Sequence, residues 1–188
     1  MASPTNFWIR WRVRIGYPVA LVYLILARPT VGSLIVGALV GALGLCVRGW
    51  AAGCLRKHEE LASGGPYAFT RNPLYFGSVI LAAGFVVAGH SLWAGIIVAA
   101  YLALFYPAVM RREEGELRAR YGNDFAEYAA RVRLFWPRLR PTQLQRKSAL
   151  QFSSQLYRRN REYQAVLGFL VGVALLWAKM HWQRFFSW

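Results

Sequence analysis

Acidic residues are scarce in this chain. Only 8 of its 188 residues are Asp or Glu, against 23 Lys or Arg, which gives a formal net charge of +15. Such a basic excess is typical of nucleic-acid-binding proteins. Here, however, the basic residues flank long apolar segments, as they do in membrane proteins that follow the positive-inside rule. We therefore expect membrane lipids around the chain and no nucleic-acid partner.

Cysteine and histidine are also rare. Cys46 and Cys54 lie in or beside an apolar segment without CxxC spacing, so we expect buried small side chains and no redox or metal site. The three histidines, His58, His90 and His181, are scattered along the chain. They do not form a cluster with the spacing of metal ligands. The sequence therefore predicts no bound metal.

Charged side chains are absent altogether from residues 73–110. This segment is long enough for two membrane-spanning helices of about 20 residues each. The turn between them is expected at Gly89-His90-Ser91, because glycine and serine favour turns. Pro107 is expected to kink or end the second of these helices.

Three further apolar segments cover residues 15–27, 31–53 and 163–178. The first is short, but flanking arginines can extend it by reaching toward the membrane surface. A cleaved signal peptide is an alternative for it, although Ile25-Leu26-Ala27 lacks the usual small-x-small cleavage site. The predicted fold is all-α: a polytopic membrane bundle of about five transmembrane helices.

The basic residues also predict how the chain is oriented. Thirteen of the 23 Lys and Arg residues lie in 111–162, and others crowd the N-terminus and residues 48–71. The connections near Arg28 and His90 are nearly free of charge. A multi-pass protein with a cytoplasmic N-terminus satisfies this alternation. The polar segments 54–72 and 111–140 then share the cytoplasmic side, where they can form one site.

An apolar stripe follows the uncharged run. Its members recur at spacings of 4, 4, 3 and 4: Leu117, Tyr121, Phe125, Tyr128 and Val132. This period predicts an amphipathic helix that lies at the membrane interface and packs against the spans. Gly122 and Asn123 are the expected points of interruption. We interpret the aromatic members as packing residues rather than ligand contacts.

Pairs of glycines four residues apart occur in two apolar segments: Gly37 with Gly41, Gly49 with Gly53, and Gly168 with Gly172. Such pairs let helix backbones approach closely in a membrane. We expect packing of segment 31–53 on segment 15–27. Formation of an oligomer through these faces is the alternative.

The two polar segments resemble the two halves of a known signature. The first half is Gly65-Pro66-Tyr67 followed by Arg71-Asn72-Pro73-Leu74-Tyr75-Phe76-Gly77. The second comprises Glu113-Glu114, Leu117, Tyr121-Gly122, Phe125, Tyr128, Arg131-Val132 and Pro137. In this order, with a helical hairpin between them, they resemble the isoprenylcysteine carboxyl methyltransferase family and its phospholipid methyltransferase relatives. The resemblance covers residues 48–140.

The resemblance implies a bacterial inner-membrane enzyme that uses S-adenosylmethionine, releases S-adenosylhomocysteine and methylates a lipophilic or prenylated substrate. It implies a methyltransferase-like domain in 1–140, followed by a polar linker and a C-terminal transmembrane helix in 141–188. The implied catalytic residues are Arg71, Asn72 and Glu113. The implied cofactor-binding residues are Leu61, Tyr67, Arg71, Asn72, Pro73, Leu74, Tyr75, Glu113 and Glu114.

The chemistry of these residues agrees with such a site. Pro73 suits the first turn of a helix, whose free backbone N–H groups attract an anion such as the cofactor's carboxylate. Tyr67 and Tyr75 offer rings for adenine or for the sulfonium. Glu113 or Glu114 can accept hydrogen bonds from the cofactor's amino group or ribose.

Two departures separate this chain from the members that methylate prenylcysteine. Those members have histidine at the position of Asn72, and asparagine cannot act as an acid or a base. They also carry an arginine, linked to the substrate, at the position of Val109. Arg111 and Arg112 lie nearby and are candidates to replace it, but neither occupies the matching position. The resemblance therefore carries over the cofactor site and leaves the methyl acceptor open.

Two other functions stay open. Membrane sterol reductases share an RHPxYxG-like segment but use NADPH, and a non-enzymatic scaffold needs no cofactor. For a scaffold, Arg71 is an interfacial anchor. Glu114–Arg118 and Glu116–Arg120 are then ordinary pairs on a helix surface.

Overall fold

The described part of the chain is built of helices alone. The computed structural model describes residues 4–57, 59–142 and 152–185, with the side chains of residues 4–10 and Arg184 outside that description. The elements are α1 (Pro4–Leu26), α2 (Val31–Gly53), the 3-10 helix η1 (Gly65–Ala68), α3 (Pro73–Gly89), α4 (Leu92–Arg131), α5 (Ser154–Arg159) and α6 (Tyr163–Phe185). The prediction of an all-α bundle is confirmed, and these residues form no strand.

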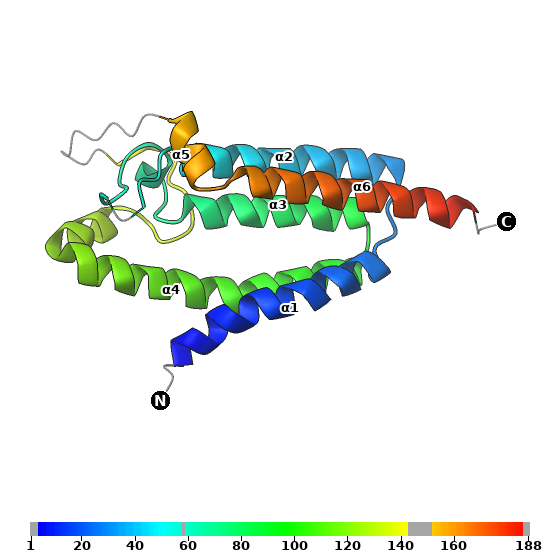
Figure 1. The fold of residues 1–188 in the computed structure, drawn as a ribbon, viewed down its shortest axis with the longest axis horizontal. Helices are drawn as coiled ribbons and strands as arrows, with labels where there is room; N and C mark the ends of the chain where they lie inside the picture. Colours follow the sequence, from blue (N-terminus) through cyan, green and yellow to red (C-terminus); the bar gives the residue numbers. More distant parts are fainter. Residues whose placement is uncertain (1–3, 58, 143–151, 186–188) are drawn as a thin grey trace.

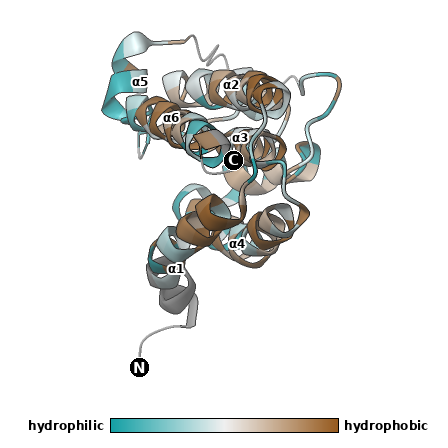
Figure 2. Cartoon of the chain, turned by 90° about the vertical axis from the view of Figure 1, so that its right-hand side faces the viewer, coloured by the Kyte–Doolittle hydropathy of each residue, from teal (hydrophilic) through white to brown (hydrophobic). Residues whose placement is uncertain are grey.

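The long helices form two layers (Figure 1). Helices α2, α3 and α6 lie side by side in one layer, and α1 and α4 pack along each other in the second. The end-on view in Figure 2 separates the same two groups. The turns between α1 and α2 and between α3 and α4 lie at one end of the molecule, and α5, η1 and the polar loops lie at the other.

Three of the described helices are long and apolar enough to cross a membrane, namely α2, α4 and α6. Helix α3 is apolar but has only 17 residues. Helix α1 has 23 residues and carries arginines in its first half. These five helices correspond to the five predicted apolar segments. That all five span a membrane stays a prediction.

Glycine allows α2 and α3 to pack backbone against backbone. A Cβ on Gly37 would lie 2.5 Å from the Gly84 carbonyl oxygen, and one on Gly44 would lie 2.6 Å from the Gly77 carbonyl oxygen. The prediction that α2 packs through its glycines on the first helix is therefore wrong. Its partner is α3, because α3 carries glycines at matching heights and α1 does not.

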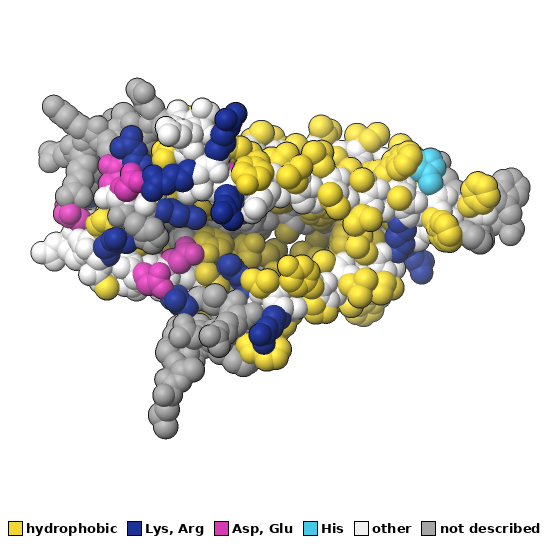
Figure 3. All heavy atoms as spheres, viewed as in Figure 1, with side chains coloured by type: hydrophobic (Ala, Val, Ile, Leu, Met, Phe, Trp, Pro, Cys, Tyr) yellow, Lys and Arg dark blue, Asp and Glu magenta, His cyan; other side chains and the backbone are white. Residues whose placement is uncertain are grey.

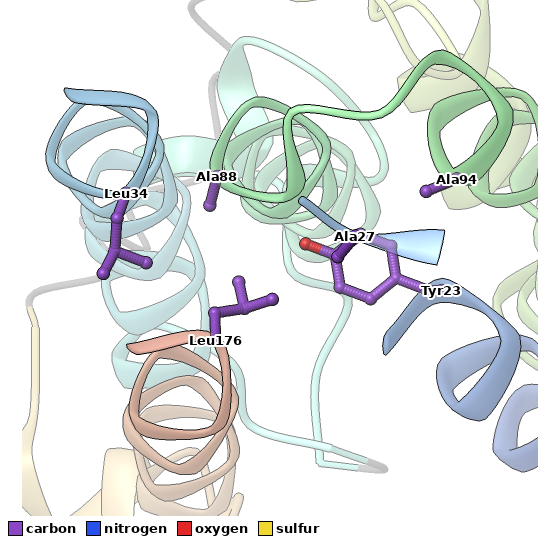
Figure 4. Close-up of a cluster of buried hydrophobic side chains, with 6 residues drawn as sticks. All are labelled: Tyr23, Ala27, Leu34, Ala88, Ala94 and Leu176. Atoms are coloured by element: carbon purple, nitrogen blue, oxygen red, sulfur yellow. The ribbon is translucent and has the colours of Figure 1, made fainter. Parts of the chain in front are cut away.

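Helix α6 also belongs to the bundle. The Phe169 ring stands edge-on to Phe85 of α3 with 5.7 Å between ring centroids, and it occupies the space beside Gly41. Near the turns between α1 and α2 and between α3 and α4, five helices or their ends contribute to one cluster of buried side chains (Figure 4): Tyr23, Ala27, Leu34, Ala88, Ala94 and Leu176. The Tyr23 hydroxyl donates a hydrogen bond to the Phe85 carbonyl over 2.5 Å, which joins the two layers.

Helix α4 runs for 40 residues and does not end at Pro107. The predicted span and the predicted amphipathic helix are therefore one element. Its break lies at Gly122, as expected, where φ is +50° and ψ is −121°. Only glycine adopts such a conformation without strain. In Figure 1 the chain turns at this end of α4 and folds back toward the loops.

The stripe on the second half of α4 is a packing surface, as predicted. Phe125, Tyr128 and Val132 are buried in a cluster with Leu61, and Leu117 and Tyr121 pack against it. Of the two cysteines, Cys54 is buried as expected, but Cys46 is exposed on α2. His58 lies outside the described residues. Among those that are described, no three His, Cys, Asp or Glu side chains gather as a metal site does.

Candidate functional site

The two polar segments of the signature lie against each other. The Arg71 amide donates to the Arg133 carbonyl over 2.9 Å, and the Arg138 amide donates to the Phe69 carbonyl over 2.9 Å. The Thr142 amide donates to the Ala68 carbonyl over 3.1 Å. The chain after α4 therefore runs beside the loop before α3, and the expected meeting of the two segments is confirmed.

A cavity of about 640 Å³ lies where they meet, which is within the usual range for small-molecule sites. It is bounded by η1, the loop residues 55–57 and 60–62, the start of α3 and the charged half of α4. Figure 3 shows charged side chains gathered at this end of the molecule, while hydrophobic ones cover most of the rest. All nine sequence-predicted site residues line the cavity: Leu61, Tyr67, Arg71, Asn72, Pro73, Leu74, Tyr75, Glu113 and Glu114.

Arg71 and Glu114 form an ion pair between the loop and α4. Arg71 Nη1 lies 2.9 Å from Glu114 Oε1, and the two side chains are 15% and 22% exposed. The alternative of a surface pair between Glu114 and Arg118 does not hold, since the carboxylate pairs with Arg71. Arg71 Nε is buried and makes no hydrogen bond within the described protein. The pair thus keeps unused polar capacity beside the cavity.

Tyr75 and Glu113 form a second link between α3 and α4. The Tyr75 hydroxyl donates a hydrogen bond to Glu113 Oε1 over 2.6 Å. The Tyr75 ring stands edge-on to Tyr106, with 5.2 Å between ring centroids. Glu113 itself is accessible to solvent. One of its oxygens is thus oriented by a phenol while the carboxylate remains open to a ligand.

Tyr67 is one of the most enclosed polar residues of the site. The residue is 6% exposed, and its hydroxyl has no hydrogen-bond partner within the protein. Its backbone carbonyl accepts a hydrogen bond of 2.8 Å from the Tyr128 hydroxyl, which fixes η1 on α4. Burial raises the pKa of the Tyr67 hydroxyl above its usual value. The hydroxyl is therefore neutral and can donate a hydrogen bond to a ligand.

The Asn72 side chain binds the backbone of the segment that follows α4. It is 8% exposed, and its side-chain amide donates to the Leu134 carbonyl over 3.0 Å. Thr70 assists by donating to the Phe135 carbonyl over 2.8 Å. Asn72 precedes Pro73, the first residue of α3, and its side chain does not cap that helix. The contacts of Asn72 are those of a residue that holds the two segments together.

The leucines supply apolar walls. Leu61 is buried against Phe125 and Tyr128, whereas Leu74 packs on a second cluster that includes Ala62 and Tyr67. Together with Pro73, which is almost fully buried, they give the cavity apolar surface beside its charged groups. Such mixed lining is typical of sites for small organic molecules.

Several lining residues were not predicted from the sequence. They include Arg12 from α1, Arg48 from α2, Ser78 from α3, Tyr106 from α4 and the loop residues Leu55, Arg56, Lys57, Glu60 and Ala62. One signal was available for Arg48, because an arginine inside an apolar segment marks a functional position more often than not. Nothing in the sequence places Arg12 near α3.

The residues suggested as replacements for an arginine at position 109 do not reach the cavity. Val109 is buried, and neither Arg111 nor Arg112 lines the cavity. Arg112 instead pairs with Glu116 one helical turn along α4, at 2.8 Å between Nε and Oε1. The cations that line the cavity are Arg12, Arg48, Arg56, Lys57, Arg71 and Arg120.

A family model described as phospholipid methyltransferase matches residues 22–124, just over half of the chain. The chain belongs to the phospholipid methyltransferase family. The match includes Glu113, Glu114 and the loop before α3. Most residues that line the cavity therefore lie in the part of the chain that the family shares. Residues 125–188 and the first 21 lie outside it.

Two curated relatives are similar to this family member. The cobalt-zinc-cadmium resistance protein CzcN of Cupriavidus metallidurans is 37% identical over 108 residues, which cover 56% of this chain and 50% of the relative. The nickel-cobalt-cadmium resistance protein NccN of Alcaligenes xylosoxydans is 38% identical over 106 residues, covering 53% and 49%. The chain therefore spans about half the length of the curated relatives it matches. No solved structure matches it.

Proposed function

We propose that the chain is an S-adenosylmethionine-dependent methyltransferase that acts on a lipid-like acceptor in the membrane. The family points to a membrane methyltransferase. The observation that carries the cofactor assignment is a pair of buried polar atoms in one cavity that make no hydrogen bond within the described protein, Tyr67 Oη and Arg71 Nε. Buried polar groups are nearly always hydrogen-bonded, so two in one cavity indicate a ligand that completes them.

The lining residues fit the parts of S-adenosylmethionine. Its carboxylate matches the Arg71 guanidinium and the first backbone N–H groups of α3, which have no partner within the helix. Its ammonium group and ribose hydroxyls match the carboxylates of Glu113 and Glu114. Leu61, Leu74 and the buried face of Tyr67 offer apolar contact for the adenine.

When bound, S-adenosylmethionine supplies a methyl group already activated on a sulfonium. The protein then has to position the cofactor and the acceptor and to exclude water. Correct orientation alone can lower the activation barrier of such reactions by roughly 7–11 kcal/mol at best. The Arg71–Glu114 pair and the Tyr75–Glu113 bond fix groups of α3 and α4 on both sides of the cavity.

We propose that the acceptor enters from the bilayer and the cofactor from the cytoplasm. The surface of the helices beyond the cavity is rich in exposed apolar side chains, among them Leu21, Ile25, Leu39, Leu43 and Leu104. The charged end fits the side that carries the basic loops in membrane proteins. The N-terminus and the cavity would then face the cytoplasm, as the distribution of Lys and Arg predicts.

The test is equilibrium binding of radiolabelled S-adenosylmethionine to the purified protein in lipid nanodiscs. We expect saturable binding that S-adenosylhomocysteine displaces and NADPH does not. Displacement by NADPH alone would support the reductase alternative. The names of CzcN and NccN suggest metal-stressed membranes as the place to seek the acceptor, so lipid extracts from metal-exposed cells are the first substrates to try.

A further inference from the structure

We propose that the segment 152–162, which lies beyond the family match, holds the wall of the cofactor cavity in place, with Glu162 and Asn160 as positioning residues. The proposal rests on the cofactor site proposed above. The segment contains α5 and leads into α6. None of its residues lines the cavity, so it acts through residues that do.

Glu162 acts through Arg48. Its carboxylate holds the guanidinium with both oxygens: Arg48 Nε lies 2.6 Å from Oε1 and Nη2 lies 3.0 Å from Oε2. Glu162 is only 6% exposed, so this is a largely buried, two-pronged pair. Arg48 Nη1 donates a further hydrogen bond to the Ser78 hydroxyl. One guanidinium therefore joins α2, α3 and the start of α6, and both Arg48 and Ser78 line the cavity.

The Arg48 side chain crosses the close contact between α2 and α3 at Gly77. A Cβ on Gly77 would lie 2.7 Å from Arg48 Cγ, so the arginine stem runs over the glycine. Without Glu162 the guanidinium would keep only its hydrogen bond to Ser78, and the planar fork of arginine is oriented by partners at fixed angles. Glu162 thus decides where the guanidinium stands in the cavity wall.

Asn160 acts on the loop at the cavity rim. Its side-chain amide donates to the Ala52 carbonyl over 2.8 Å and to the Leu55 carbonyl over 2.9 Å. The first carbonyl belongs to the end of α2, and the second belongs to the loop after it, where Leu55 lines the cavity. Two further contacts fasten the same region: the Ser153 amide donates to the Gly53 carbonyl over 2.9 Å, and Arg159 pairs with Glu59 at 2.5 Å.

Stability and positioning can be separated here by chemistry. Removing one member of a buried ion pair leaves an uncompensated charge, whereas replacing both by apolar residues of similar size is often neutral for stability. Glu162→Gln alone therefore lowers the melting temperature. Arg48→Met with Glu162→Met restores much of it but leaves Ser78 and the cavity wall without the oriented guanidinium.

The experiment compares the wild type, Glu162→Gln and the double Met variant as full-length protein in detergent. The readouts are the melting temperature, the dissociation constant of S-adenosylhomocysteine by calorimetry, and hydrogen–deuterium exchange of the rim residues 55–57 and 59–62. We expect the double variant to melt near the wild type, to bind about tenfold more weakly, and to exchange faster at the rim. Asn160→Ala should raise rim exchange in the same way.

The matched control is Glu127→Gln, which breaks an exposed pair with Arg131 that does not line the cavity. This variant should bind and exchange like the wild type. A stable double variant with wild-type affinity and wild-type rim exchange would overturn the proposal. If the wild type binds no S-adenosylhomocysteine, the proposed function fails, and rim exchange alone then decides whether the segment braces the cavity.

Discussion

Arg71, on the loop before α3, and Glu114, on α4, meet as an ion pair with 2.9 Å between Nη1 and Oε1. The pair joins the two halves of the signature across the apolar hairpin that separates them in sequence. Arg71 also keeps a buried atom, Nε, that makes no hydrogen bond within the described protein. A contact that served stability alone would leave no such atoms, because each unsatisfied buried group costs about 1–3 kcal/mol.

Substitution of either member should therefore affect binding and stability together. Arg71→Ala and Glu114→Gln each remove one side of a half-buried pair, and we expect S-adenosylhomocysteine affinity to fall at least about tenfold, with a loss of roughly 1–3 kcal/mol in unfolding free energy. Arg71→Lys keeps the charge but not the fork, so it should recover stability more than affinity. Calorimetry and thermal melts in detergent measure both. Full affinity in a folded Arg71→Ala protein would contradict the assignment.

The hydroxyl of Tyr67 gives a sharper test. Tyr67→Phe removes a buried donor that has no partner, so the ligand-free protein should be as stable as the wild type or more stable. Affinity for S-adenosylhomocysteine should nevertheless fall, by about tenfold if the hydroxyl donates to the ligand.

The matched control for Tyr67 is Tyr128→Phe. It removes the hydroxyl that donates to the Tyr67 carbonyl over 2.8 Å, so it should destabilise the protein by about 1 kcal/mol through the fold. Thermal melts with and without ligand separate the two variants. If Tyr67→Phe destabilised the ligand-free protein as much as Tyr128→Phe does, the hydroxyl would have a structural partner instead.

The raised pKa of Tyr67 predicts a pH dependence of stability. Burial favours the neutral phenol in the folded state, so the folded pKa lies above the unfolded value of about 10. The resulting stabilisation is fully present below about pH 10 and is lost as the pH rises toward the folded pKa. Between pH 10 and 11 the wild type should therefore lose stability faster than Tyr67→Phe, as measured by chemical denaturation in detergent. Parallel curves for the two proteins would show that this hydroxyl does not change its environment on folding.

Glycine packing between α2 and α3 predicts opposite effects at two positions. A Cβ on Gly84 would collide with the Gly41 backbone nitrogen and lie 2.6 Å from the Gly37 carbonyl oxygen. Gly84→Ala should therefore push the helices apart and lower the free energy of unfolding by about 1–3 kcal/mol, as overpacking typically does. The melting temperature should fall with it. Gly168 has nothing within 4 Å of its would-be Cβ, so Gly168→Ala should be neutral or slightly stabilising in a helix. Equal melting temperatures of the two variants would argue against the close packing of α2 on α3.

Hydropathy and charge predicted much of this architecture because they act locally. The apolar runs predicted the long helices, and Gly89-His90-Ser91 predicted the turn before α4. The positions of the polar segments predicted that the two halves of the signature meet. Pro107 does not end α4, because a proline inside an apolar helix is tolerated when neighbouring groups satisfy the freed backbone atoms.

The remaining errors concern partners that sequence spacing cannot identify. Glu114 has Arg118 one turn away, yet it pairs with Arg71 because the loop before α3 folds over that face of α4. Arg48 finds Glu162 only because α6 returns to α2. Likewise, the glycines of α2 could be assigned a function in packing but not a partner helix, since matching heights emerge only in three dimensions.

The central claim is that the cavity between Arg71 and Glu113 binds S-adenosylmethionine. Calorimetric titration of the detergent-solubilised protein with S-adenosylhomocysteine, with NADPH as a parallel ligand, tests it most directly. We predict saturable one-site binding of S-adenosylhomocysteine that Arg71→Ala or Glu113→Ala weakens at least about tenfold, and no heat from NADPH. Binding of NADPH alone, or of neither ligand to a folded protein, would contradict it.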